Sequence, residues 1–149
     1  KIAAAICARR EQQPIRTTLE LVDIIRSAMP ASALREKQHP AKRSFQAIRI
    51  AVNDELGSVE KVMRDAIPCL NPGGRLAIIT FHSLEDRIVK DGMADAAEGC
   101  TCPPNCPVCV CGKKPKVKLI SRKPIVSGDE ELERNPRARS AKLRVCEKL

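Results

Sequence analysis

Five cysteines within twelve positions have the spacing that most directly indicates chemistry in this chain. They are interrupted by prolines and followed by a glycine, in the order Cys100, Cys102, Pro103, Pro104, Cys106, Pro107, Cys109, Cys111, Gly112. Because a reducing compartment leaves thiols unoxidised, such a loop favours a metal site over disulfides. A structural Zn2+ would take four thiolates from the two Cys-X-Cys pairs, Cys100, Cys102, Cys109 and Cys111, with Cys106 to spare. Zinc knuckles usually have two residues between paired cysteines, so a reduced, metal-free loop is the alternative.

A second candidate site follows a short apolar run in the middle of the chain. Residues 71–74 (Asn-Pro-Gly-Gly) predict a tight turn, and the apolar run 76–79 predicts a strand covered on both faces. The chain then becomes polar, and Ser83 stands three residues before Asp86, the spacing of a helix cap. Ligands of open α/β sheets bind at the carboxyl ends of strands, which is where His82 and Ser83 fall.

The other patterns predict an α/β fold of one domain, with a mostly parallel sheet. Helical periodicity covers residues 1–10, 17–29, 40–56 and 58–70, with a polar linker at 31–38. We expect Thr17 and Glu20 to form a capping box, Gly57 to end the third helix, Ser58 to cap the fourth and Pro68 to distort its last turn. In residues 116–120 and 141–146 apolar residues alternate with polar ones, which predicts two half-exposed strands that pair antiparallel at one edge of the sheet. A helical turn is expected at 129–134.

The charge of the chain points to a polyanionic partner. Its formal net charge is +9, and residues 112–149 carry 12 Lys and Arg against 5 Asp and Glu. A solvated basic tail is the alternative explanation. With two Phe and neither Trp nor Tyr, the chain has few side chains on which bases could stack.

The sequence does not indicate a membrane protein. No apolar run reaches the length of a membrane span, and the amino end has no signal peptide, so a cytoplasmic location is expected. The chain begins at Lys1, directly inside a helix-like run, and we therefore expect a piece of a longer protein.

Four motifs closely resemble the MraW-type methyltransferases of bacteria, which act on small-subunit ribosomal RNA. They are HPAKRSFQAIRIAVNDEL at 39–56, PGGR at 72–75, FHSLEDR at 81–87 and NPRARSAKLR at 135–144. The resemblance runs over essentially the whole chain. It implies S-adenosylmethionine-dependent methylation of a cytosine N4 amine in 16S rRNA of the small ribosomal subunit, and it leaves a homodimer open.

The resemblance also implies how the chain is organised. Residues 1–55 would be the later part of a helical substrate-recognition insert, and residues 56–149, with the Cys-rich loop 99–112, the carboxyl-terminal half of a Rossmann-like methyltransferase domain. The family's glycine-rich turn and acidic ribose-binding residue belong to an amino-terminal half that this sequence does not supply. We therefore assign no S-adenosylmethionine-binding residue in this chain, and expect activity only from the intact protein.

Site residues follow from the same resemblance. An exocyclic cytosine amine is a poor nucleophile, so its orientation and the acceptance of its proton should determine the rate. His82 and Ser83 are the predicted catalytic residues, although His82 would equally suit a helix start that only orders the loop. For Glu85, Asp86 and Arg87 we expect structural roles, as helix caps and ion-pair partners. The predicted RNA contacts are His39, Lys42, Arg43, Arg49, Asn53 and Arg87.

Two other functional classes remain open on sequence grounds. A zinc-stabilised RNA-binding module would need only the cysteine loop and the basic tail. A non-catalytic interaction fragment would need neither. Binding of S-adenosylmethionine distinguishes the methyltransferase from both of these classes. Metal content distinguishes the zinc-stabilised module from the interaction fragment.

Overall fold

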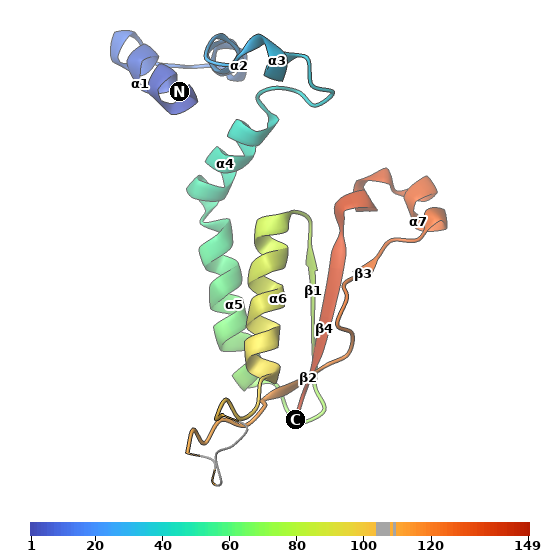
Figure 1. Ribbon diagram of the computed structural model, residues 1–149. Coiled ribbons are helices and arrows are strands. Elements are labelled where there is room, and N and C mark those ends of the chain that lie inside the picture. The colour runs from blue at the N-terminus through green and yellow to red at the C-terminus, as the bar shows by residue number, and fades with distance from the viewer. Residues whose placement is uncertain (104–107, 109) are drawn as a thin grey trace. The chain divides into compact units, whose positions relative to one another are not determined.

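The computed structural model describes residues 1–103, 108 and 110–149 and divides into two compact units, Lys1–Asp54 and Glu55–Leu149 (Figure 1). Cys106 and Cys109 lie outside the described residues. That the first unit is part of a substrate-recognition insert stays a prediction.

The first unit is entirely helical. Its second helix begins with the predicted capping box: the Glu20 N–H donates to Thr17 Oγ1 at 3.2 Å, and the Thr17 N–H donates to Glu20 Oε2 at 3.3 Å. Ile25 of that helix is fully buried. The predicted linker at 31–38 instead contains a one-turn helix, which starts after Pro30, whose fixed φ suits a helix start. The helices are α1 (Ile2–Gln12), α2 (Thr18–Ser27), α3 (Ala31–Leu34) and α4 (Lys42–Asn53).

The boundary between α4 and the next helix differs from the prediction. α4 ends at Asn53, Asp54 adopts a left-handed conformation with φ 47°, and α5 (Glu55–Cys69) begins at once. Aspartate tolerates this region better than most residues, so it can interrupt a helix without glycine. Gly57 therefore does not end a helix and Ser58 does not cap one, because both lie inside α5. Pro68 lies in the last turn of α5, and its distortion of that turn stays a prediction.

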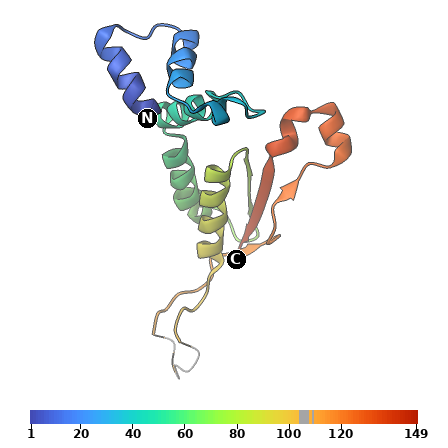
Figure 2. The same ribbon diagram turned by 45° about the horizontal axis from the view of Figure 1, so that its top comes forward.

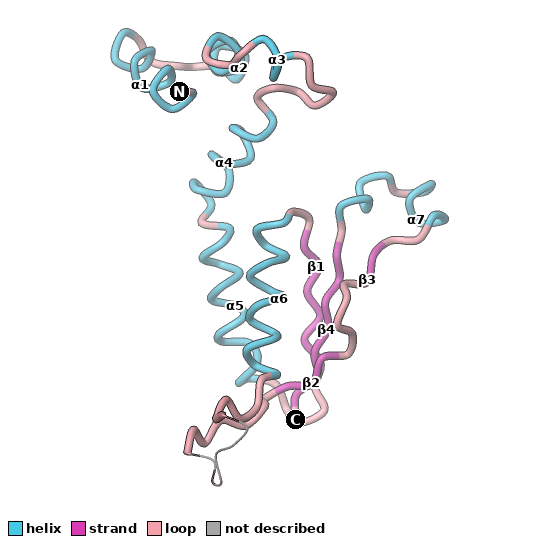
Figure 3. Tube along the Cα trace, viewed as in Figure 1, coloured by secondary structure: helices cyan, strands magenta, loops and turns pink. Residues whose placement is uncertain are grey.

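The second unit contains an antiparallel sheet (Figure 3). The last strand lies between the first two, and every described strand pair is antiparallel. The prediction of a mostly parallel sheet is therefore wrong for these strands. The predicted antiparallel closing pair is confirmed, but its last strand is central rather than at an edge. After α5, the elements of the second unit are β1 (Arg75–Thr80), α6 (Ser83–Ala97), β2 (Val117–Leu119), β3 (Ile125–Val126), α7 (Asp129–Arg134), the 3-10 helix η1 (Pro136–Ser140) and β4 (Lys142–Lys148).

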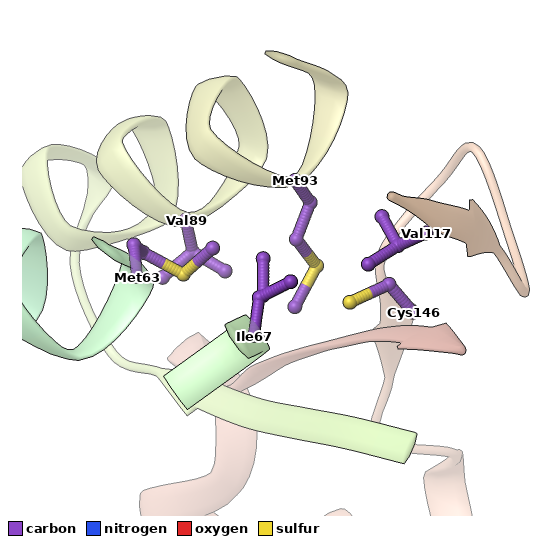
Figure 4. Packing of buried hydrophobic residues seen from close by; sticks show 6 residues of the cluster. All are labelled: Met63, Ile67, Val89, Met93, Val117 and Cys146. Atoms are coloured by element: carbon purple, nitrogen blue, oxygen red, sulfur yellow. The ribbon is translucent and has the colours of Figure 1, made fainter. Parts of the chain in front are cut away.

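The core of this unit lies between helices and sheet. α5 and α6 lie side by side, and α6 packs against the sheet (Figures 1 and 2). Figure 4 shows the side chains of both helices meeting those of β2 and β4 in one cluster, made of Met63, Ile67, Val89, Met93, Val117 and Cys146. Leu76 and Ile78 of β1 pack against this cluster, whereas Ala77 and Ile79 are exposed on the other face. Among the described residues only one face of β1 is covered, so the prediction of a strand covered on both faces is wrong for this part of the chain.

Candidate functional site

A histidine caps the helix that follows β1. His82 has an extended backbone, and its Nδ1 accepts a hydrogen bond from the Glu85 N–H at 3.4 Å. In return, Glu85 Oε2 accepts from the Phe81 N–H at 3.0 Å and from the His82 N–H at 3.2 Å. The prediction of Ser83 as the cap is wrong by one position, because the His82 ring nitrogen reaches the first turn and Ser83 is already helical.

The other nitrogen of His82 faces two carboxylates. The side chain is only 11% exposed, and Nε2 lies 3.2 Å from Glu85 Oε1 and 3.9 Å from Glu55 Oε2. Neither contact has the geometry of a hydrogen bond, so the buried Nε2 has no hydrogen-bond partner among the described residues. Because Nδ1 accepts a hydrogen bond, we assign the proton of the neutral ring to Nε2. Both nitrogens therefore face the protein rather than solvent.

An ion-pair cluster fixes the same helix to the sheet. Asp86 is buried and accepts hydrogen bonds from Arg144 Nε at 2.7 Å, Arg144 Nη2 at 3.1 Å and Lys142 Nζ at 3.2 Å. The Arg144 hydrogen bond, with Lys142 assisting, lowers the pKa of Asp86 below its ordinary value, against the opposing effect of burial. Asp86 is thus an ion-pair partner, as expected, and it ties the start of α6 to β4.

The structure adds one residue that the sequence did not indicate. Glu55, the first residue of α5, reaches His82 from another helix, and no local pattern relates the two positions. One ligand atom from each of Glu55, His82 and Glu85 lies within 4.8 Å of the others, a donor set that a divalent cation can accept. Ser83 is exposed beside them, as is Phe81. The carboxyl end of β1 therefore presents a polar, rigidly held turn.

The predicted RNA contacts fall on both units. In the first unit, Lys42, Arg43, Arg49 and Asn53 lie on α4 and are exposed. His39, also exposed, precedes this helix, and its Nδ1 accepts from the Ala41 N–H at 3.3 Å. Arg87 is exposed on α6 of the second unit. The first-unit residues thus form a basic helix and its entry, a suitable surface for phosphates.

Three of the four predicted zinc ligands come together. One ligand atom from each of Cys100, Cys102 and Cys111 lies within 4.8 Å of the others. Hydrogen bonds from the backbone of Lys113 and Thr101 lower the pKa of the Cys111 thiol to about 5, and those from Val110 and Cys111 lower the pKa of Cys102. The fourth, Cys109, lies outside the described residues.

Comparisons with known proteins identify similar sequences over the whole length of this chain. A model of the MraW methylase family matches residues 1–149. Relatives named "Ribosomal RNA small subunit methyltransferase H" are 61% identical in Heliobacterium modesticaldum, 60% in Brevibacillus brevis and 55% in Geobacter sp. strain M21. Each alignment covers 100% of this chain and 48% of the relative, so the chain spans about half the length of the curated relatives it matches. Within the part of the chain that the structure describes, no helix is long and apolar enough to cross a membrane.

Proposed function

The chain belongs to the MraW methylase family, and from this premise we propose that the intact protein is an rRNA methyltransferase. It would transfer the methyl group of S-adenosylmethionine to the N4 amine of a cytosine in 16S rRNA. The observation that carries the proposal is the family match over every residue of the chain, together with relatives named as methyltransferases of small-subunit rRNA. A zinc-stabilised RNA-binding module is not favoured, because the match covers far more than the cysteine loop and the basic tail.

The exposed side of β1 supports a larger sheet in the intact protein. In the described sheet β1 pairs with β4 along one edge only, and Ile79 on its outer face is 57% exposed. An apolar strand with an unpaired edge favours association with further strands. This arrangement fits the second half of a Rossmann-like sheet, in which other strands and a second helical layer would cover β1.

We propose that the target base binds at the turn of Phe81, His82 and Ser83. The cytosine must leave the RNA stack to reach an active site, and its amine must be held in line with the methyl group. Since both ring nitrogens of His82 face the protein, its role would be to position the turn. The exposed Ser83 hydroxyl, which can donate and accept, would contact the base.

A transfer assay tests the proposed function. The intact protein that contains this chain is mixed with S-adenosylmethionine labelled in its methyl group and with small ribosomal subunits that lack the modification. We expect label in 16S rRNA and none in ribosomal protein. Label confined to protein, or to the RNA of the large subunit, would show that the substrate is wrongly assigned.

Removing one cation from α4 should weaken RNA binding and its dependence on salt. Each phosphate contact releases counterions, so Arg43→Ala should reduce the slope of log K against log salt by about 1. Arg10→Ala removes an arginine of α1 that is also exposed, and it is the matched control. Filter binding of the intact protein to 16S rRNA at several salt concentrations gives both slopes. If the two variants behave alike, α4 is not the phosphate-binding surface.

A further inference from the structure

Three cysteines join the two ends of the segment between α6 and β2. Cys100 follows shortly after the end of α6 at Ala97, and Cys111 lies where the chain returns towards β2. Cys102 is half-buried, and the other two are exposed. Segments at opposite ends of a loop thus place their thiol groups side by side.

The sulfur separation fits a shared metal ion better than a disulfide. Cys100 Sγ and Cys111 Sγ are 3.6 Å apart. A disulfide requires about 2.05 Å, whereas two thiolates bonded at about 2.3 Å to one tetrahedral zinc ion lie about 3.8 Å apart. The observed distance is therefore close to the edge of a zinc–sulfur tetrahedron.

The surrounding backbone is arranged to receive negative sulfur atoms. Cys111 accepts hydrogen bonds from the backbone of Lys113 and Thr101, and Cys102 accepts them from Val110 and Cys111. Hydrogen bonds to ligating groups orient metal ligands and stabilise their charge. The thiols therefore lie in an environment that suits thiolates.

Contacts outside the thiols hold the returning segment in place. Lys113 Nζ lies 2.6 Å from Glu98 Oε2 and 3.1 Å from Asp95 Oδ1, and the Lys116 N–H donates to the Ala96 carbonyl at 2.8 Å. These interactions fasten the segment after Cys111 to the end of α6. The cluster is thus supported by the fold and does not depend on an ion to bring its two sides together.

We propose that Cys100, Cys102 and Cys111 are three ligands of a structural Zn2+ ion, which links the residues just after α6 to those just before β2. No further His, Cys, Asp or Glu ligand joins the three among the described residues. Structural zinc is four-coordinate, so the fourth coordination position would be filled by a donor other than these three side chains. Metal binding at such a site adds its free energy to the stability of the fold. The zinc ion would stabilise the fold and take no part in the proposed methyl transfer.

Elemental analysis of the intact protein, purified without chelator, tests this site. We expect about one zinc ion per chain. Cys100→Ser and Cys111→Ser should each lose most of the zinc and lower the melting temperature. Cys69→Ser replaces an exposed cysteine on α5, outside the cluster, and should retain both. Zinc retained in full by the two cluster variants, or lost equally from the control, would overturn the assignment.

Cobalt substitution keeps the test decisive if a variant fails to fold. Wild-type protein reconstituted with Co2+ should show the intense visible bands and the sulfur-to-metal charge-transfer absorption of tetrahedral thiolate coordination. If protein purified without chelator contains no metal and all its thiols react with a thiol reagent, the proposal is contradicted. A Cys100–Cys111 disulfide found by non-reducing peptide mapping would also contradict it.

Discussion

Asp86→Asn should lower the free energy of unfolding by about 3 kcal/mol, because it leaves the guanidinium of Arg144 buried beside a neutral amide. The side chains of Asp86 and Arg144 are each only 11% exposed, so water cannot replace the lost carboxylate. Urea unfolding of the intact protein, followed by circular dichroism, measures the loss.

Asp91→Asn is the matched control for this experiment. It removes an aspartate from the same helix, but one whose side chain is 60% exposed and whose ion pair with Lys90 lies at the surface. Such a pair contributes about 0–1 kcal/mol. Equal losses in the two variants would show that the Asp86 cluster does not fasten α6 to β4.

The same ion pair predicts a dependence on pH. Because the folded-state pKa of Asp86 is lowered, the stabilisation is fully present above the ordinary aspartate pKa of about 3.9. It is lost as the pH falls through the lower folded-state pKa. The wild type should therefore lose more stability than Asp86→Asn over this acidic range. If the free energy of unfolding falls equally with pH in both proteins, the ion pair does not account for the stability of the wild type.

Replacing His82 with Ala should lower turnover on the order of 100-fold, because the turn at the end of β1 loses its cap and its packing against Glu55. RNA affinity and its salt dependence should stay nearly unchanged, since phosphate contacts elsewhere supply the attraction and the turn positions only the target base. Turnover with small subunits and filter binding measure the two effects separately.

His82→Asn distinguishes positioning from proton transfer. Asparagine is a good helix cap but cannot relay a proton as imidazole does, so a positioning role predicts that it restores most of the turnover. If His82→Asn is folded and capped but as slow as His82→Ala, the imidazole itself takes part in the chemistry. If His82→Ala turns over normally, the turn does not belong to the active site.

Local patterns predicted much of the fold. The capping box at Thr17 and Glu20 and the strand before Phe81 arise from interactions between near neighbours, and the structure confirms them. The end of α4 was missed because Asp54 adopts a left-handed conformation that sequence patterns associate with glycine. Ser83, a more usual capping residue, was predicted as the cap, although His82 was also considered as a residue that starts the helix, and the structure shows His82 in the capping position.

Long-range features could not be predicted from local patterns. The position of β4 between β1 and β2 depends on pairing between segments far apart in the chain. The contact of Glu55 with His82 likewise joins two helices that share no sequence period. By contrast, the cysteine spacing alone predicted a cluster, since Cys100 and Cys111 lie at the two ends of one short segment.

Identification of the modified nucleoside tests the central claim most directly. After reaction of the intact protein with unmodified small subunits, the 16S rRNA is digested to nucleosides and analysed by mass spectrometry against synthetic standards. We predict N4-methylcytidine, formed only when both S-adenosylmethionine and enzyme are present. A methyl group on cytosine C5, on a ribose 2′-oxygen or on another base would contradict the account.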